Sequence, residues 1–585
     1  MSSRHIASRA PWIPILSRAP DIATRDGAPT ATTAPRTVHR RTPVSWLEWT
    51  LLLVAAMWVI VLAFVRWPVL LHTHFNSNST IDSAFFALAG QLVRDGQVPY
   101  VAFWDHKPPL IYFIDAFALT LSGGAVWGIW LVAVVALVAT LGMTWLAWRP
   151  VVGPTAAVIG ITWVAFSVGI VSPFNLTEGF VLPIQAAALI VLSRWSPLRR
   201  SAFGSGVLLG ILGALAFLLR PNLIGTPAVV VATMVIGLML TRRTRKLPLL
   251  FVGGAAGAIL VIAPVLLWLN AHDALRPFWD QVFHYNALYS ATSWKSRARS
   301  AFEGVALSTA HGTLLLPLIG WIVAAYRLAV RNTGATPKAA LLFGVIWAPM
   351  EIALAAVPGR TYMHYFATLL LPFGFLTAIA ACEAFGAVER AVSPAAMRRW
   401  RRNATLILCG GIAIAPIGWA AIAVRDAGLE RGERAQQVNA TVRYVRANSA
   451  AGSRLLVWGH AADVYLFANR RPASRFVYPL AMLTPKYADS ALVATFLDDL
   501  RTSAPPLIID ATPGTSESDD LVPSLAAWNP HWRYPESGVA WWTMTPALRR
   551  FYDHVATNYS AIGTVGPQHW IIYARRENLL SVRHP

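Results

Sequence analysis

The residues of this chain that are best suited to chemistry lie in one loop between two apolar stretches. The loop covers about residues 67–123 and contains Asp82 and the segment Trp104-Asp-His-Lys-Pro-Pro109. A carboxylate can accept a proton, and a lysine can hold an anion through a charge-assisted hydrogen bond. Most other loops are only a few residues long, and a protein that merely spanned a membrane would not need this one. We therefore expect the chemistry of the chain to lie in this loop.

Two of these side chains also have an ordinary structural explanation. Ser79 or Thr80 can cap a helix that runs to Arg94. Asp82 would then be an acid in the first helical turn, where the helix dipole favours negative charge. Lys107 can instead extend its ammonium group to lipid headgroups. Spacing alone leaves both interpretations open.

The composition is that of a membrane protein. The 585 residues are 56% hydrophobic and only 13% charged, which is too apolar for a soluble chain. The net charge of +21 comes from short basic clusters between apolar runs, so we expect no nucleic-acid partner. Both cysteines, Cys382 and Cys409, lie in apolar runs, which argues against a disulfide framework or a thiolate metal site.

The apolar runs predict a mainly α-helical, polytopic transmembrane bundle. About 11 runs approach the ~20 residues that cross a bilayer. They lie at 45–66, 124–148, 154–171, 177–194, 203–219, 222–240, 248–269, 305–328, 338–357, 366–387 and 404–424.

The basic residues predict the orientation of the bundle. Residues 1–44, with seven arginines, are expected to form a disordered cytoplasmic tail. Every second loop is then basic, as the positive-inside rule requires. These loops carry Arg149 and the clusters at 199–200, 242–246, 327–338 and 398–402. The loop at 67–123 and the C-terminal segment would lie outside the cell.

Two further external segments are large. The stretch at 270–304 is partly amphipathic and suits a helix lying along the membrane interface. Residues 425–585 alternate short apolar strands, at 454–458, 506–510 and 570–573, with helices at 491–500 and 546–559. This alternation predicts a small extracytoplasmic α/β domain. The expected division is thus 1–44, 45–424 and 425–585.

The motifs of the first loop resemble the GT-C superfamily of membrane glycosyltransferases. The matching residues are an aspartate after the first span, Gly96-x-x-Pro-Tyr100, and Trp104-Asp-x-Lys-Pro-Pro-Leu110. The chain is most similar to the branch of bacterial dolichyl-phosphate-mannose protein mannosyltransferases and lipid A aminoarabinose transferases. Weaker support comes from Asn175-Leu-Thr-Glu178, Leu219-Arg-Pro-Asn222, the segment 278–286, and Tyr362-Met-His-Tyr-Phe366.

The resemblance implies transfer of a sugar from a polyprenyl-phosphate donor to an acceptor hydroxyl at the outer face of a bacterial plasma membrane. The acceptor would be a glycan, a lipid or a protein. Such a reaction needs a base for the hydroxyl proton and cations for the leaving phosphate. By matching position, Asp82 would be the base and Lys107 would bind the donor phosphate. Residues expected to bind donor phosphate or substrate beside Lys107 are Asp105, His106, Glu178, Arg220, Tyr362 and His364.

Ordinary interpretations remain for two of these residues. Arg220 can be an interfacial anchor at a helix end, and Tyr362 can belong to an aromatic belt. Many members of the mannosyltransferase branch have Asp-Glu where this chain has Asp82-Ser83, and the aminoarabinose transferases have Glu in place of His106. These departures leave the donor sugar open.

A cofactor is not expected. Asp82, Asp105 and Glu178 could share a divalent cation if the fold brought them together, although no spacing requires it. Lys107 and Arg220 could neutralise the phosphate instead.

Glu351 is an intramembrane acid, and such a residue has either a function or a structural partner, for which Arg220 and Arg360 are candidates. The cluster at 458–475 could shape an acceptor site, although ordinary packing after a strand is the simpler interpretation. Rival functions are a lipid-linked sugar flippase or other transporter, a glycan ligase or polymerase, and a sensor anchored by the bundle.

Overall fold

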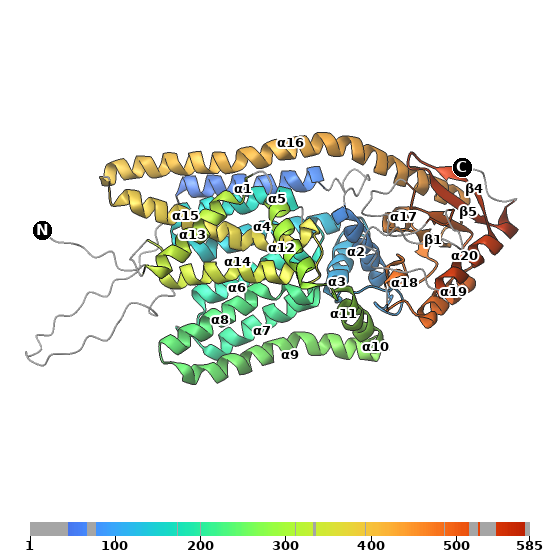
Figure 1. Ribbon diagram of the computed structural model, residues 1–585, viewed down its shortest axis with the longest axis horizontal. Coiled ribbons are helices and arrows are strands. Elements are labelled where there is room, and N and C mark those ends of the chain that lie inside the picture. Colours follow the sequence, from blue (N-terminus) through green and yellow to red (C-terminus); the bar gives the residue numbers. More distant parts are fainter. Residues whose placement is uncertain are drawn as a thin grey trace, which may run out of the picture.

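The computed structural model describes residues 45–66, 78–171, 174–198, 200–309, 312–330, 335–391, 393–484, 486–513, 524–526 and 546–579. A helical bundle forms most of the molecule, and a small domain with a β-sheet lies at one end of it (Figure 1). The predicted class, a transmembrane helical bundle with a small C-terminal α/β part, is confirmed. The predicted tail at 1–44 and the start of the first loop, 67–77, lie outside the described residues.

Eight helices among the described residues are long and apolar enough to cross a membrane, and three shorter apolar helices accompany them. The chain is therefore a multi-pass membrane protein. One predicted span, 305–328, is interrupted, because α12 ends at Ser308 and α13 begins at Leu315. The helices of the bundle are α1 (Trp46–Arg66), α4 (Trp127–Val152), α5 (Pro154–Val171), α6 (Thr177–Arg194), α7 (Ala202–Leu219), α8 (Gly225–Leu240), α9 (Leu247–Ala271), α12 (Trp294–Ser308), α13 (Leu315–Ala329), α14 (Lys338–Ala355) and α15 (Leu370–Glu389).

Close helix packing in the bundle depends on small residues. A Cβ atom on Gly206 or Gly210 of α7 would lie 2.1 or 2.0 Å from a backbone oxygen of α9. Gly257 of α9 has the same relation to α7, at 2.1 Å. Glycines spaced four apart let two membrane helices approach through their backbones.

The basic clusters gather at the end of the bundle that is farther from the sheet. Arg149 lies 3.7 Å from Glu48 at the start of α1, and Arg327 lies 3.7 Å from Glu383 near the end of α15. Lys246, before α9, donates to the carbonyl of Pro197. The turns between α8 and α9 and between α15 and α16 lie at this end (Figure 1). The two ends of the bundle thus differ in charge.

The first loop folds into two helices, α2 (Asn78–Arg94) and α3 (Leu110–Leu121), which lie between the bundle and the sheet (Figure 1). Since α2 begins at Asn78, Asp82 lies beyond the first turn, which contains no acid. The interpretation of Asp82 as a first-turn acid is therefore wrong. Gly90 lets the two helices touch, because a Cβ there would lie 2.5 Å from the Cβ of Asp115 on α3.

The segment after α9 turns back toward this loop. It contains α10 (Leu275–Trp279), a π-helical turn η4 (Asp280–His284) and α11 (Tyr285–Tyr289). We expected a helix lying along the membrane interface. One side of the segment is buried in the protein, with Phe278, Val282 and Tyr285 at most 1% exposed, while Trp279 is 49% exposed. π-Helical turns often occur at functional sites.

A single 55-residue helix, α16 (Pro394–Asn448), packs against α5 and continues into the sheet domain (Figure 1). The predicted boundary at residue 424 therefore falls inside one helix. The sheet has the order β2-β1-β3-β5-β4, with β1, β2 and β3 parallel and β5 antiparallel to both β3 and β4. Its strands are β1 (Arg454–Trp458), β2 (Arg471–Pro472), β3 (Leu507–Asp510), β4 (Tyr559–Val565) and β5 (Trp570–Arg575).

The helices of this domain are α17 (Ala462–Ala468), α18 (Leu480–Leu483), α19 (Ser490–Ser503) and α20 (Pro546–Asn558). Short 3₁₀ turns in the chain are η2 (Pro221–Leu223), η3 (Thr244–Lys246), η5 (Met363–Leu369) and η6 (Arg576–Asn578). The predicted strands at 454–458, 506–510 and 570–573 correspond to β1, β3 and β5, and β4 pairs with β5 as a hairpin partner that was not predicted.

Candidate active site

Three predicted residues from three separate segments meet beside the sheet domain. The Asp82 carboxylate, on α2, lies 3.8 Å from the Lys107 ammonium in the loop before α3. It also lies 3.9 Å from the Nε2 atom of His364, in η5. The Asp82 side chain is 34% exposed, whereas those of Lys107 and His364 are 8% exposed. Asp82 is thus the accessible member of the group, as a proton acceptor must be.

A second charged pair accompanies this group. The Arg220 guanidinium donates to Glu178 Oε1 at 2.6 Å and lies 3.8 Å from the centre of the Tyr365 ring. Thr177 donates to the other oxygen of Glu178 at 2.8 Å. Both Arg220 and Glu178 act electrostatically on Lys107. The site therefore contains two anions and two cations, and Arg220 already has a carboxylate partner.

Tyr362 and His364 lie side by side in the short connection before α15. Their rings are stacked, with centroids 5.9 Å apart and planes inclined by 12°. Because His364 also approaches Asp82, the pair forms one wall beside the exposed carboxylate. Flat ring surfaces of this kind can orient a sugar ring.

Asp105, by contrast, points away from solvent and is fully buried. Its carboxylate accepts a hydrogen bond of 2.5 Å from Tyr112 and another from Tyr478 of the C-terminal domain. The backbone N–H of His106 donates to it at 2.8 Å, and His106 Nδ1 lies 3.3 Å away. Asp105 is therefore saturated by protein donors, so its geometry suits support of the loop better than contact with a substrate.

Charge on the loop is stabilised by this network. Burial alone would raise the pKa of Asp105, but Lys107 and the donors from His106 and Tyr112 hold it below its ordinary value. Burial opposes the charge of Lys107 too, yet Asp105 and Asp82 raise the pKa of the ammonium above its usual value. Burial and the neighbouring Lys107 lower the pKa of His106. At neutral pH the site holds a charged lysine and a neutral His106.

Several residues that hold the loop were not predicted from the sequence. Gln281, in η4, accepts from the backbone N–H of Asp105 at 3.2 Å and donates to the carbonyl of Tyr100 at 2.9 Å. Asn286 donates to the carbonyl of His106 at 2.6 Å. Both belong to the motif at 278–286 that supported the resemblance, and this motif was the one available signal for them.

Ser83, the residue after Asp82 on α2, joins a buried polar network. Its hydroxyl accepts from the Asn175 amide at 3.1 Å, and the same amide lies 3.0 Å from Asp115 Oδ2 on α3. Asp115 is fully buried. The network ties the helix that carries Asp82 to α3 and to the connection before α6.

The carboxylates proposed to share a metal ion are separately engaged. Tyr112 and Tyr478 donate hydrogen bonds to the Asp105 carboxylate, and Arg220 and Thr177 donate hydrogen bonds to the Glu178 carboxylate. Within the part of the chain that the structure describes, no three His, Cys, Asp or Glu side chains form a group suited to a metal ion. Asp105 and Glu178 therefore already have protein donors, and Asp82 is the exposed carboxylate of the three.

Two other sequence candidates have structural partners of their own, Glu351 and the Asp463 and Tyr465 side chains of the cluster at 458–475. Glu351, fully buried in α14, accepts hydrogen bonds from Thr226 at 2.7 Å and Gln185 at 3.3 Å, while Arg220 pairs with Glu178 instead. In the cluster at 458–475, Asp463 pairs with Arg434. Tyr465 accepts from a backbone N–H of β1 at 2.7 Å. These contacts are those of ordinary packing.

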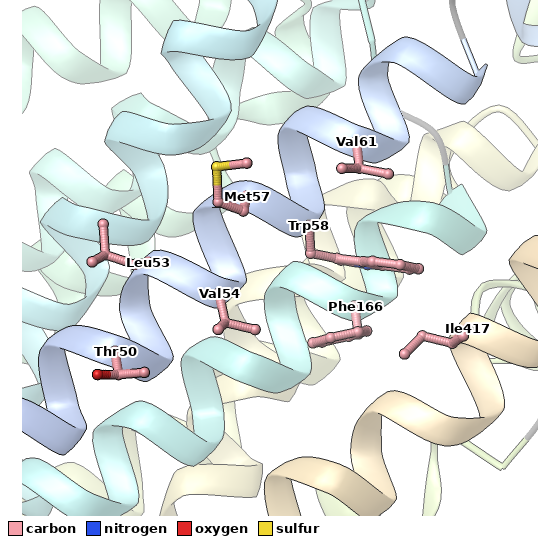
Figure 2. A pocket seen from close by; sticks show the side chains of 8 residues that line it. All are labelled: Thr50, Leu53, Val54, Met57, Trp58, Val61, Phe166 and Ile417. Atoms are coloured by element: carbon pink, nitrogen blue, oxygen red, sulfur yellow. The ribbon is translucent and has the colours of Figure 1, made fainter.

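A groove of about 460 Å³ opens elsewhere, between α1, α5 and α16 (Figure 2). Its lining is almost wholly apolar, and two of its residues, Leu53 and Met57, are 62% and 56% exposed. It contains neither Asp82 nor Lys107. Such a surface on a membrane helix faces lipid chains and offers no catalytic group.

Comparisons with known proteins bear on the same segments. Residues 106–268 match the dolichyl-phosphate-mannose-protein mannosyltransferase family. Among solved structures, ArnT from Cupriavidus metallidurans bound to undecaprenyl phosphate aligns over 92% of this chain and 100% of that chain, with a TM-score of 0.55 and 12% identity. The apo state of ArnT gives a TM-score of 0.55 at 14% identity, over 92% and 99% of the two chains.

A weaker structural match is the archaeal oligosaccharyltransferase AglB from Archaeoglobus fulgidus in complex with an inhibitory peptide and a dolichol-phosphate. It has a TM-score of 0.45 and 13% identity, over 80% of this chain and 69% of that chain. No curated protein sequence matches the chain. The family match at 106–268 and the ArnT fold confirm the expected resemblance and the enzyme class, glycosyltransferase. The chain thus has the GT-C fold and resembles the mannosyltransferase and ArnT branch of that superfamily.

Proposed function

We propose that this protein transfers a sugar from a polyprenyl-phosphate-linked donor to an acceptor hydroxyl on the outer face of a bacterial plasma membrane. The observation that carries the proposal is the meeting of Asp82 and Lys107, whose charged groups lie 3.8 Å apart. Support also comes from the matched mannosyltransferase family and from a structural neighbour whose structure contains undecaprenyl phosphate.

In this proposal, the acceptor oxygen attacks the anomeric carbon of the sugar while Asp82 takes the hydroxyl proton. The bond between the anomeric carbon and the phosphate oxygen breaks, and its electron pair leaves with the polyprenyl phosphate. Lys107 stabilises the charge that grows on the phosphate. Arg220 adds positive potential next to Lys107, and Tyr362 and His364 flank the sugar. The acceptor is a glycan, a lipid or a protein.

The test is release of polyprenyl phosphate when the purified protein is given a panel of polyprenyl-phosphate sugars together with candidate glycan, lipid and peptide acceptors. Asp82→Asn keeps the size of the side chain but removes the base, so the rate should fall about 10²- to 10⁴-fold. Lys107→Met should also abolish most of the release. Asp95→Asn is the matched control, because Asp95 is an exposed acid just after α2 and pairs only loosely with Arg94, at 3.2 Å.

Each outcome separates the proposed reaction from its rivals. A flippase or other transporter would move the lipid-linked sugar without cleaving it, so intact donor and no free polyprenyl phosphate would exclude the transferase. Full activity of Asp82→Asn would exclude Asp82 as the base. A glycan ligase or polymerase would instead join preassembled chains, which mass analysis of the product would reveal.

We further propose that the reaction needs no divalent cation. Lys107 and Arg220 supply two positive charges, and Glu178 and Asp105 are already engaged by protein donors. Treatment with EDTA should therefore leave the rate within about twofold, since the charge of the phosphate is met by the side chains. Loss of activity that added Mg²⁺ or Mn²⁺ restores would contradict this.

A further inference from the structure

The C-terminal domain is joined directly to the loop that carries Lys107. The Trp104 indole is 2% exposed and packs in the same apolar cluster as Trp458 and Phe496 of that domain. Its backbone N–H donates to the carbonyl of Arg475 at 2.8 Å, and its ring N–H donates to the Tyr487 hydroxyl at 3.1 Å. The domain therefore completes the core around this loop.

One residue of the domain touches both halves of the site. The Tyr478 hydroxyl donates to Asp105, two residues before Lys107. Its ring packs edge-on against Phe85, with centroids 4.9 Å apart. Phe85 is three residues after Asp82 on α2, so the two lie on the same side of that helix. Tyr478 thus spans the helix of the proposed base and the loop of the proposed phosphate-binding lysine.

The contact to Asp105 bears directly on where Lys107 lies. The carbonyl of Lys107 accepts from Tyr100 at 2.8 Å, and the Tyr112 hydroxyl lies within reach of both this carbonyl and Asp105, at 3.1 and 2.5 Å. Asp105 and Lys107 are therefore parts of one buried hydrogen-bonded turn. Removing one donor from a buried carboxylate leaves unmet hydrogen-bonding capacity, which the surroundings must rearrange to satisfy.

Tyr478 is itself held by its own domain. The His460 ring stacks on it, with centroids 6.0 Å apart and planes inclined by 27°. His460 follows directly after β1 and Gly459, so the sheet fixes its position. The path from the sheet to Asp105 thus consists of packed rings and one hydrogen bond.

We infer that Tyr478 is a positioning residue of the transferase site, through which the C-terminal domain sets the distance between Asp82 and Lys107. The inference rests on the proposed function and extends it. The domain is then a working part of the active site.

The test is Tyr478→Phe in the full-length protein, which keeps the ring and its contact with Phe85 and removes only the hydroxyl. The kcat/KM for the polyprenyl-phosphate donor should fall about 10- to 100-fold, because Asp105 loses a donor and Lys107 moves. The donor KM should rise, whereas a purely structural loss would lower the amount of active protein without changing KM.

Tyr487→Phe is the matched control at the same interface. Tyr487 donates to Asp280 at 2.6 Å and accepts from Trp104, but it does not contact Asp105. Tyr487→Phe also removes one hydroxyl and weakens the docking of the domain. It should nevertheless change kcat/KM by less than about threefold. Equal losses in the two variants would reduce Tyr478 to a docking contact and overturn the inference. Unchanged kinetics in Tyr478→Phe would overturn it as well.

A second variant and a second measurement keep the inference testable on its own. Phe85→Leu breaks the ring contact to α2 but keeps the hydroxyl on Asp105, and it should lower kcat/KM about 3- to 10-fold. If the wild-type protein cleaves no donor, the proposed function fails. In that case the inference is tested by binding of undecaprenyl phosphate alone. The Kd of Tyr478→Phe for this lipid should be about 10-fold higher than that of Tyr487→Phe, and equal Kd values would overturn the inference.

Discussion

His106 is a neutral side chain between two charged neighbours. It lies between Asp105, whose pKa is held low, and Lys107, whose pKa is raised. Burial and Lys107 lower the pKa of His106 below its ordinary value, while Asp105 and Asp82 act in the opposite direction. The neutral imidazole lets the loop keep one buried cation, Lys107, in place of two.

This arrangement predicts a dependence of stability on pH. Since the folded pKa of His106 is below its unfolded value of about 6.5, the unfolded chain binds more protons between the two values. Stability should therefore decrease as pH falls below about 6.5, with a slope of at most about 1.4 kcal/mol per pH unit from this residue. His106→Gln should reduce the decrease in melting temperature between pH 7.5 and pH 5.5. An unchanged decrease would show that other groups cause it.

Helices α2 and α3 act as one unit, because Gly90 lets them pack in direct contact. A methyl group at this position would meet the Cβ of Asp115 at 2.5 Å and the backbone of Ala116 at 2.9 Å. Neither atom belongs to the end of a flexible side chain. The helix of Asp82 would therefore move relative to the loop of Lys107.

Gly90→Ala should destabilise the protein by about 1–3 kcal/mol and lower donor cleavage, because the added methyl group overpacks the interface. Gly142→Ala is the matched control, since a Cβ on this exposed glycine of α4 would have no atom within 4 Å. Melting temperature and cleavage rate are the measurements. Equal behaviour of the two variants would show that α2 and α3 have room to separate.

The elements also show what the sequence could predict. Spans and the main strands follow from local hydropathy, which persists over a whole helix or strand. Asp82 and Lys107 were found through a motif, and the structure brings them together. Gln281 lay in a weaker motif that did not reveal its contact with Asp105. Tyr478 had no such signal, because it is distant in sequence and its role arises only when the C-terminal domain folds against the loop. A tyrosine in an apolar run looks like an ordinary core residue.

The unequal charge of the two ends of the bundle predicts its orientation. The basic clusters lie at the end opposite Asp82, so the positive-inside rule predicts that Asp82 faces away from the cytoplasm. Asp95→Cys and Arg243→Cys would report the two ends in a variant whose native Cys382 and Cys409 are replaced by Ser. A membrane-impermeant maleimide should label the cysteine at 95 in intact cells, and the one at 243 only after permeabilisation. The reverse pattern would invert the proposed topology.

The long helix α16 connects the bilayer to the site in a further way. Its 55 residues extend over about 80 Å, far more than the ~30 Å hydrocarbon core, and it enters the sheet domain without a break. A helix in a thinner bilayer tilts to keep its apolar part covered. Because α16 has no joint, such a tilt would also move β1, His460 and Tyr478. We therefore predict that lipids of different chain length, which change the thickness of the surrounding membrane, change the rate of donor cleavage without contacting the active site.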